Sequence, residues 1–335
     1  MPKSAAHSAR ICRDGLVRSR VLDYAAVSRP GAVDLTVDVG AVHLANPVIA
    51  AAGTFGYGIE FAELTDLNRL GGIVVKGLSL EPMEGAPAPR LVPTAAGMLN
   101  AVGLQNIGVR RFIAEKLPAL RAYRTQVIAN VFGRTIEEYA EVARHLEGAE
   151  GLAAYELNIS CPNVACGGLQ FGSNPQMASE VVAAVRRVAR RPLWVKLSPN
   201  VTDIGSIAKA AAEAGADALT VANTYTAMSV EFRSRKSRLG NPSGGLSGPA
   251  IRPITTKLVY EAHKATAIPI IALGGIEKAE DVLEYLVVGA SAVQIGTANF
   301  ADPRACERTV DQLKRCCIEN NIPIIRELTG TFRAD

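Results

Sequence analysis

The stretch Asn158-Ile159-Ser160-Cys161-Pro162-Asn163 follows the mostly apolar run from Leu152 to Leu157. The apolar run predicts a buried strand, and the polar residues begin where that strand ends. When parallel strands form a barrel, residues in this position lie at the mouth, where enzymes usually carry out their chemistry. We therefore interpret the amide of Asn158 and the thiol of Cys161 as active-site groups.

The apolar run belongs to a series of eight, many of them rich in β-branched residues. The predicted strands are Pro47–Ala51, Gly72–Val75, Gln126–Ala129, Ala154–Leu157, Leu193–Val195, Ala218–Val221, Ile268–Leu273 and Ala292–Ile295. Helical periodicity occurs between them, as in Ile136–Leu146, Met177–Arg190, Ile204–Ala214 and Ala279–Val288. Eight βα units in series predict an α/β fold of the (β/α)8 TIM-barrel type, because alternation requires a parallel sheet and eight strands close it.

The N-terminal region differs from this pattern. Residues 1–30 are rich in Arg, Ser and Ala and predict an extension, while residues 31–335 predict a single domain. The alternating segment Leu35–Val39, a turn at Gly40 and the segment Val42–Leu44 predict a β-hairpin that could close one end of the barrel.

Composition limits the class of protein. The 335 residues include 48% hydrophobic and 20% charged residues with a net charge of +4, which fits one large globular domain without a nucleic-acid-binding track. No segment is apolar enough to span a bilayer or to act as a signal peptide, so we expect a cytoplasmic protein with no membrane contact. Six irregularly spaced cysteines without a Cys-x-x-Cys pair argue against a disulfide framework and against a metal site.

Distinctive residues follow every predicted strand. They are Gly53, Lys76, Asn130, Asn158 with Cys161, Lys196, Asn223, Gly274 with Gly275, and Gly296 with Thr297. On a barrel these positions converge on one face, so amides, two ammonium groups and a thiol are expected around one cavity. The long connections 77–107 and 224–247 are predicted to be lids over it.

The types of residue suggest ligands. Glycines after the seventh and eighth strands let backbone N–H groups approach an anion, which predicts a phosphorylated ligand or cofactor. A lysine beside apolar strand residues would be costly to bury without an anion or polar ligand, so Lys76 and Lys196 are expected to face the cavity. Either could stabilise negative charge on a reduced ring, or Lys196 alone could form a Schiff base.

Uncharged amides and a single thiol complete the set. Asn100, Asn130, Asn158 and Asn223 would suit a flat heterocycle with alternating carbonyl and N–H groups, such as a pyrimidine. No histidine follows a barrel strand, so Cys161 lacks a partner for nucleophilic catalysis and is interpreted as a general base.

In these residues the sequence resembles the dihydroorotate dehydrogenase family from Asp34 to about Asn320. The motifs are Val75–Gly77, Met98–Asn106, Asn158–Asn163, Val195–Asn200, Gly244–Gly248 and Gly296–Ala298. Cys161 resembles the base of the soluble class 1 members. The segments Gly103–Asn106 and Gly167–Gly172 resemble subclass 1B more than the fumarate-using subclass 1A.

That resemblance implies a flavoprotein of pyrimidine biosynthesis. Cys161 would take the C5 proton of dihydroorotate, while the C6 hydride passes to N5 of FMN to give orotate. A homodimeric core would pair with a second subunit that carries FAD and a [2Fe-2S] cluster and reduces NAD. This chain itself has no Gly-x-Gly-x-x-Gly fingerprint and no cluster-type cysteines.

The resemblance also implies roles for individual residues. The substrate-binding residues would be Lys76, Asn100, Ala101, Val102, Gly103, Leu104, Asn158, Asn223 and Thr224. The FMN-binding residues would be Ala52, Lys76, Gly77, Asn130, Asn158, Lys196, Ala222, Gly248, Gly274, Gly275, Gly296 and Thr297. Ala52 stands where the family usually has a serine, and Ala222 where it has a larger aliphatic residue.

Other functions stay open at this point. Within oxidoreductases they are a fumarate-dependent enzyme like subclass 1A and a dihydropyrimidine dehydrogenase. A Schiff-base aldolase that uses Lys196 and a non-catalytic phosphate-binding barrel are alternatives of other classes.

Overall fold

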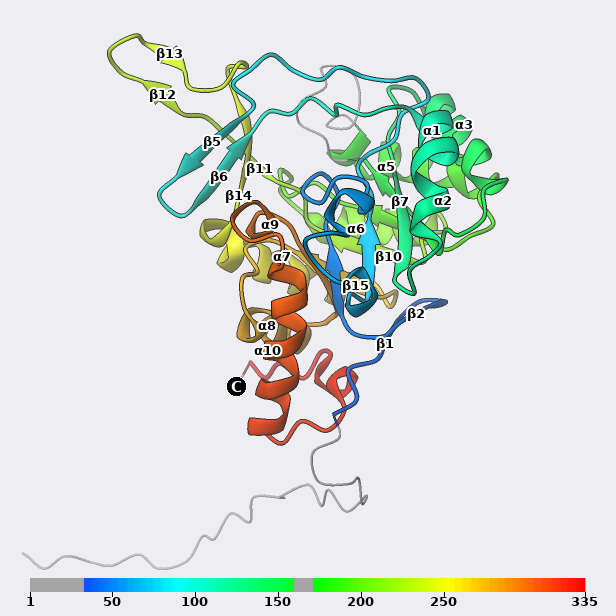
Figure 1. Ribbon diagram of the computed structural model, residues 1–335, viewed down its shortest axis with the longest axis vertical. Coiled ribbons are helices and arrows are strands. Elements are labelled where there is room, and N and C mark those ends of the chain that lie inside the picture. Colours follow the sequence, from blue (N-terminus) through cyan, green and yellow to red (C-terminus); the bar gives the residue numbers. More distant parts are fainter. Residues whose placement is uncertain (1–32, 160–170, 335) are drawn as a thin grey trace, which may run out of the picture. The chain divides into compact units, whose positions relative to one another are not determined.

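The computed structural model describes residues 33–159 and 171–334. Its centre is a closed barrel of eight parallel strands in the order β10-β15-β16-β3-β4-β7-β8-β9 (Figure 1). The strands are β3 (Val48–Ala50), β4 (Gly72–Val74), β7 (Gln126–Val131), β8 (Ala154–Asn158), β9 (Leu193–Lys196), β10 (Ala218–Val221), β15 (Ile270–Leu273) and β16 (Ala290–Ile295). Each lies on a predicted strand, so the predicted barrel is confirmed.

Helices cover the outside of this barrel. They are α1 (Val109–Arg111), which continues through a π-helical segment, η3 (Phe112–Lys116), into α2 (Leu117–Leu120), then α3 (Ile136–Glu147), α5 (Pro175–Arg186), α6 (Ile204–Glu213), α7 (Arg252–Ala265), α8 (Ala279–Val287), α9 (Ala298–Ala301) and α10 (Ala305–Glu319). The four predicted helices are confirmed within a few residues. Helix α5 begins two residues early because Pro175 is suited to a first turn and the Asn174 side chain accepts hydrogen bonds from the N–H groups of Gln176 and Met177.

The first βα unit departs from the predicted repeat. Strand β3 is followed only by the 3-10 turns η1 (Ile59–Phe61) and η2 (Leu67–Arg69). Helix α10, from the far end of the sequence, packs against β3 instead. The C-terminal part of the chain therefore completes the outer layer, and the short turn η5 (Ile325–Leu328) follows it.

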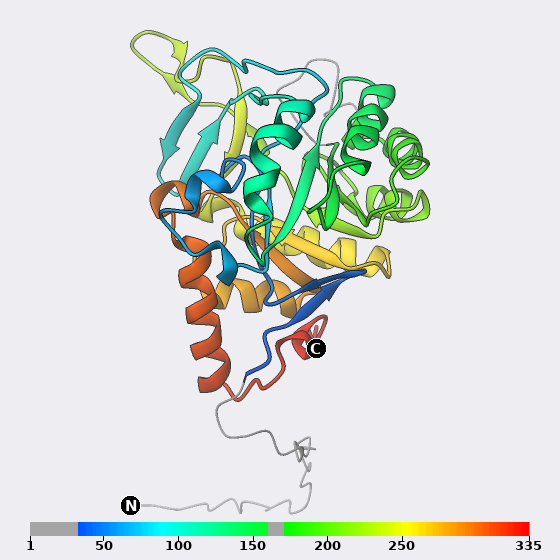
Figure 2. The ribbon, with the colours of Figure 1, turned by 45° about the vertical axis from the view of Figure 1, so that its right-hand side comes forward.

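The predicted hairpin is present as β1 (Val37–Val39) and β2 (Val42–Leu44), which pair in antiparallel fashion. Its apolar side chains are buried, and its turn at Gly40 lies against the carbonyl of Asp217, which directly precedes β10. Asp217 marks the amino end of the barrel, so the hairpin covers the end opposite the strand tips (Figure 2). The expectation that it closes one end of the barrel is confirmed.

The two long connections form a structure that the sequence did not predict. Strands β5 (Leu91–Thr94) and β6 (Gly97–Asn100) come from the first connection, and β11 (Tyr225–Ala227) and β14 (Gly244–Ser247) from the second. They pair across the two connections as one antiparallel sheet in the order β11-β14-β6-β5. Val92, Leu99, Ala101 and Leu239 form a small apolar cluster of their own on this sheet. A short 3-10 turn, η4 (Pro249–Ile251), then leads into α7.

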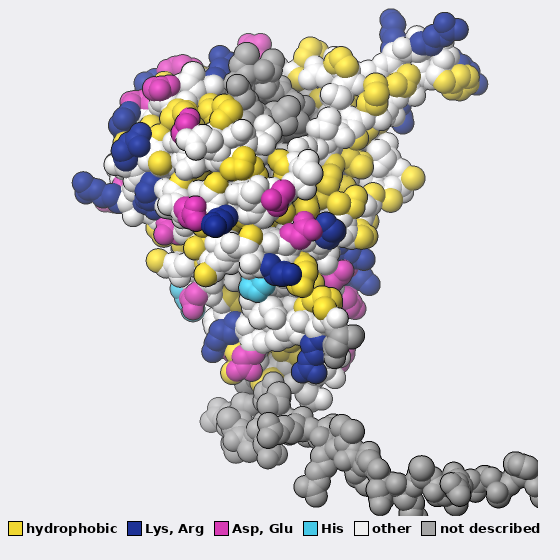
Figure 3. All heavy atoms as spheres, turned by 180° about the vertical axis from the view of Figure 1, so that it is seen from behind, with side chains coloured by type: hydrophobic (Ala, Val, Ile, Leu, Met, Phe, Trp, Pro, Cys, Tyr) yellow, Lys and Arg dark blue, Asp and Glu magenta, His cyan; other side chains and the backbone are white. Residues whose placement is uncertain are grey.

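An arm projects from the second connection. It consists of β12 (Val230–Glu231) and β13 (Lys236–Ser237), and it stands away from the barrel at the upper left of Figure 1. Phe232 on this arm is 75% exposed, and Met228 and Val230 are also exposed. Figure 3 shows hydrophobic side chains together with Lys and Arg side chains near its tip.

The described residues contain no helix with the length and apolar character needed to cross a membrane.

The close approach of β6 and β14 depends on a glycine, Gly97, which has no side chain. A Cβ atom on Gly97 would lie 2.0 Å from the carbonyl oxygen of Ser247. We expect Gly97→Ala to lower the free energy of unfolding by about 1–3 kcal/mol, because the strands must separate to admit the methyl group. Urea unfolding would measure this change.

Gly148→Ala is the matched control, because a Cβ atom there meets nothing within 4 Å and its φ of −76° suits any residue. We expect its free energy of unfolding to stay within about 0.5 kcal/mol of the native value. Equal effects at both positions would contradict the close approach of the two strands.

Candidate active site

The carboxyl ends of the barrel strands surround one cavity of about 180 Å³. Nearly all predicted site residues that the structure describes line it: Ala52, Lys76, Gly77, Asn100, Val102, Gly103, Leu104, Asn130, Asn158, Lys196, Ala222, Asn223, Thr224, Gly248, Gly274, Gly275, Gly296 and Thr297. The predicted convergence on one mouth is confirmed for these residues. Cys161 and Cys166 lie outside the described residues.

Ala101 is placed differently from its neighbours. Successive residues of a strand point to opposite sides, and Asn100 at the end of β6 lines the cavity. The Ala101 side chain, one position on, is buried in the small apolar cluster of the four-stranded sheet. Its predicted contact with a ligand would therefore have to use the backbone.

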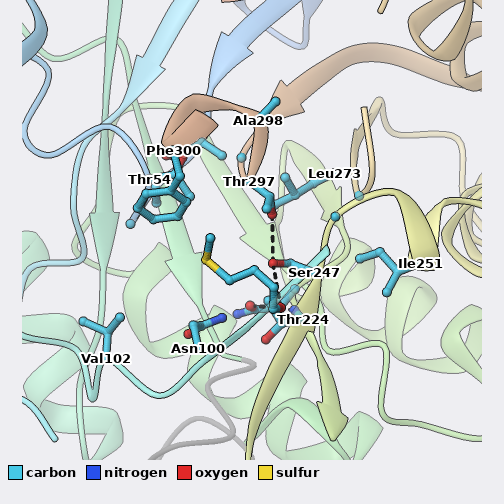
Figure 4. A pocket seen from close by; sticks show the side chains of 18 of the residues that line it. Thr54, Asn100, Val102, Thr224, Ser247, Ile251, Leu273, Thr297, Ala298 and Phe300 are labelled. Atoms are coloured by element: carbon cyan, nitrogen blue, oxygen red, sulfur yellow. Dashed lines mark hydrogen bonds between the residues drawn. The ribbon is translucent and has the colours of Figure 1, made fainter. Parts of the chain in front are cut away.

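The four-stranded sheet forms one wall of the cavity. The Asn100 side chain donates a hydrogen bond to the Gly245 carbonyl at 3.1 Å, which fixes β6 against β14. Met98, Ser247 and Thr224 line the cavity beside Asn100. The predicted lids are thus walls built from both connections, and Figure 4 shows Asn100, Thr224 and Ser247 close together within them.

Two lysines face the cavity, as predicted. Lys196, at the end of β9, is only 5% exposed. Lys76, after β4, is half-buried, and burial lowers the pKa of its ammonium below the ordinary value, with the positive charge of Arg90 lowering it further. A bound anion would relieve the cost that burial imposes on the Lys76 charge.

Asparagine and threonine groups form a connected set on the same side. The Asn223 side-chain nitrogen donates to the side-chain oxygen of Asn158 at 3.2 Å, and the Asn223 oxygen accepts from the Thr224 N–H at 2.8 Å. Tyr139 donates to the Asn158 carbonyl at 2.7 Å. These bonds fix the orientation of amides that line the cavity, which suits recognition of a ring with both donors and acceptors.

Asn106, unlike the asparagines that line the cavity, has a structural role. Its buried side chain bonds to Ser79, Leu104 and Gly108, and so shapes the loop that carries Gly103 and Leu104.

Glycine-rich turns also line the cavity. Gly248 and Gly275 have φ angles of 94° and 69°, and a Cβ atom on Gly275 would lie 2.9 Å from the Gly248 carbonyl. The Thr297 hydroxyl donates to the Ser247 hydroxyl at 2.8 Å, which links the end of β16 to β14 (Figure 4). Because these glycines have no side chain, a ligand in the cavity could approach their backbone closely, as the predicted anion site requires.

Sequence reasoning missed several residues of the cavity. Thr54, Leu273, Ile251, Glu277 and Phe300 line it, and Figure 4 places Phe300 beside Thr54 with Ile251 on the other side. Thr54 supplies a hydroxyl two residues after Ala52, but that hydroxyl donates to the Ala51 carbonyl at 3.0 Å. The signal available was the glycine-rich segment 53–58 directly after a strand.

A polar cluster inside the barrel was also missed, apart from Asn130, which was predicted as an FMN-binding residue. It consists of Asn130, Glu156, Thr220 and Gln294, one residue from each of four strands. Glu156 accepts hydrogen bonds from the side chains of the other three. The available signal was Glu156, a single acidic residue within the apolar run 152–157. The prediction of a buried strand did not account for it.

Comparison with known proteins identifies the family. Residues 34–317 match the family model described as dihydroorotate dehydrogenase. The chain belongs to the dihydroorotate dehydrogenase family. This confirms the predicted resemblance, and the family is flavin-dependent.

Relatives named as dihydroorotate dehydrogenases are similar in sequence to this chain over almost their whole length. A protein of Solidesulfovibrio magneticus named "Dihydroorotate dehydrogenase B (NAD(+)), catalytic subunit" is 53% identical, with 90% of this chain and 99% of the relative covered. A protein of Geotalea daltonii with the same name is 49% identical, with 90% and 98% covered. A protein of Solibacter usitatus named "Putative dihydroorotate dehydrogenase A (fumarate)" is 54% identical, with 89% and 98% covered.

A solved structure supports the fold. The dihydroorotate dehydrogenase of Eimeria tenella, crystallised in complex with ferulenol, matches with a TM-score of 0.75 and 23% identity. The match covers 90% of this chain and 89% of the other.

Proposed function

We propose that this chain oxidises dihydroorotate to orotate with bound FMN, in the de novo pathway to UMP. The observation that carries the proposal is one cavity lined by glycine-rich turns, a cluster of carboxamides and two lysines. Membership of the dihydroorotate dehydrogenase family supports the same reaction and weighs against a Schiff-base aldolase. The cytoplasmic location predicted from the sequence is part of this proposal.

The residues present fit FMN. The side-chain oxygen of Asn130 is buried and has no hydrogen-bond partner among the described residues, so a ligand N–H group would satisfy it. Gly248, Gly274, Gly275, Gly296 and Thr297 would hold the phosphate through backbone N–H groups. Ala52, Lys76, Gly77, Asn130, Asn158, Lys196 and Ala222 would contact the rest of the cofactor. When bound, FMN supplies the acceptor for the C6 hydride.

The substrate would lie against the carboxamides. Asn100, Asn158 and Asn223 would bind its ring carbonyl and N–H groups, with Thr224 and residues 101–104 beside them. The Lys76 ammonium would pair with the substrate carboxylate. The hydrogen bonds within the set hold these groups in place before the substrate arrives, which lowers the cost of orienting it.

Cys161 would remove the C5 proton, because the motif places it three residues after Asn158. A thiol that is shielded from water and surrounded by hydrogen-bond donors can act as a base of suitable strength.

Electrons would leave through a partner subunit that carries FAD and a [2Fe-2S] cluster and reduces NAD, on a homodimer of this chain. Relatives named as the catalytic subunit of an NAD-linked enzyme support this acceptor. Exposed apolar side chains on the projecting arm, such as Phe232, are typical of protein contacts and support a partner. The relative named for fumarate supports a second candidate, in which fumarate takes the electrons directly.

The acceptor can be tested by steady-state turnover of dihydroorotate. We expect NAD reduction only when the chain is purified together with its partner subunit, and no turnover with fumarate. Turnover with fumarate by the chain alone would overturn the NAD-linked proposal and favour the second candidate.

The base can be tested by substitution. We expect Cys161→Ala to slow flavin reduction by about 10²–10⁴-fold with FMN still bound, which is the usual effect of removing a general base. Rapid mixing with dihydroorotate under anaerobic conditions measures this rate. Cys166→Ala is the matched control and should leave it unchanged. An unchanged rate in Cys161→Ala would assign the proton transfer to another group.

Lys76 predicts a pH dependence. Its lowered pKa means that the ammonium loses its proton at a lower pH than the ammonium of an ordinary lysine. Orotate binding should therefore be strong at neutral pH and weaken as pH rises through that lowered pKa. A titration followed by flavin absorbance measures the dissociation constant.

In Lys76→Gln we expect orotate binding to be at least about tenfold weaker at pH 7 and the alkaline loss to be absent. Lys209→Gln, on an exposed part of α6, should behave like the native chain. An alkaline loss that persists in Lys76→Gln would show that another group titrates.

A further inference from the structure

The polar cluster inside the barrel lies below the cavity and is not explained by ligand contact alone. Asn130 on β7, Glu156 on β8, Thr220 on β10 and Gln294 on β16 are all at most 1% exposed. Of these four, only Asn130 lines the cavity. A carboxylate is costly to bury without hydrogen bonds, so its presence here calls for a reason.

The bonds to Glu156 divide between its two oxygens. One oxygen accepts from the Asn130 side-chain nitrogen at 2.7 Å. The other accepts from the Thr220 hydroxyl at 2.7 Å and from the Gln294 side-chain nitrogen. Gln294 thus holds the carboxyl group from β16, the strand opposite β8 in the ring, and Thr220 holds it from β10, two strands from β8. The carboxyl group in turn holds Asn130.

This arrangement fixes which end of the Asn130 amide faces the cavity. The amide nitrogen of Asn130 donates to Glu156, so the amide oxygen points away from the carboxyl group. That oxygen lies toward Gly77, since a Cβ atom on Gly77 would be 3.0 Å from it. Gly77 and Asn130 both line the cavity, and the oxygen has no partner among the residues that the structure describes.

We propose that Glu156 is a positioning residue, which holds the Asn130 carboxamide with its oxygen toward the cavity. This wall of the cavity then accepts a hydrogen bond and selects a ligand that presents an N–H or O–H group there. Without the carboxylate, the amide could rotate by 180° and present its nitrogen, which would oppose a ligand donor. The inference rests on the proposed function in that FMN is the ligand used to probe it.

The test is a double-mutant cycle on FMN affinity. Glu156→Gln fills the same volume but can offer either an acceptor or a donor to Asn130, so it removes the constraint on the amide. We expect it to raise the dissociation constant of FMN about fivefold, the value of one neutral hydrogen bond, and to shift the visible absorption band of the bound flavin. In the Asn130→Leu background, Glu156→Gln should change the dissociation constant by less than twofold.

Thr220→Val is the matched control inside the same cluster. It removes a bond to the other oxygen of Glu156 and leaves the bond to Asn130 in place. We expect its FMN dissociation constant and absorption band to match the native chain, although its apoprotein melts at a lower temperature. Quenching of FMN fluorescence by the apoprotein gives the affinities, and thermal unfolding of each apoprotein monitors the fold.

Three outcomes would overturn the inference. One is a native-like affinity in Glu156→Gln, and another is an equal loss in the native and Asn130→Leu backgrounds, which would assign Glu156 a general structural role. The third is a native chain that binds no FMN, which would overturn the proposed function as well. If the native chain binds FMN and Glu156→Gln binds it equally well, only the inference fails.

Discussion

Closure of the parallel barrel is the constraint on which the site depends. Because all eight strands run in one direction and pair in a ring, their carboxyl ends must meet around one opening. Lys76 and Lys196 are separated by 120 positions in the sequence, yet they line the same cavity for this reason. The hairpin β1–β2 lies at the amino end, opposite the opening where the polar residues lie.

A second constraint comes from the two long connections. Each connection supplies two strands of the four-stranded sheet, and the pairing of β6 with β14 joins Asn100 to Gly245 across 145 positions. Glycines at 97 and 244 permit this approach, because a Cβ atom on Gly97 would lie 2.0 Å from the Ser247 carbonyl oxygen and one on Gly244 would lie 2.4 Å from the Asn100 carbonyl oxygen. The result is a wall that holds Asn100, Thr224 and Ser247 in place over the barrel mouth.

The sequence predicted the barrel and most of the cavity because both depend on local signals. Apolar β-branched runs mark the strands, and the residue after each run, such as Asn130 or Lys196, must lie at the rim. The sheet β11-β14-β6-β5 could not be predicted, since its pairing is long-range and its strands are short. Glu156 was missed because its partners come from three other strands, and only the closed barrel brings them together.

The central claim is that this mouth holds FMN and dihydroorotate together. The most direct measurement is the visible spectrum of the purified chain, loaded with FMN and freed of excess cofactor, before and after anaerobic addition of dihydroorotate. The account predicts that the flavin band is retained on purification and bleaches when dihydroorotate is added. A chain that cannot retain FMN, or a bound flavin whose band is unchanged by dihydroorotate, would contradict it.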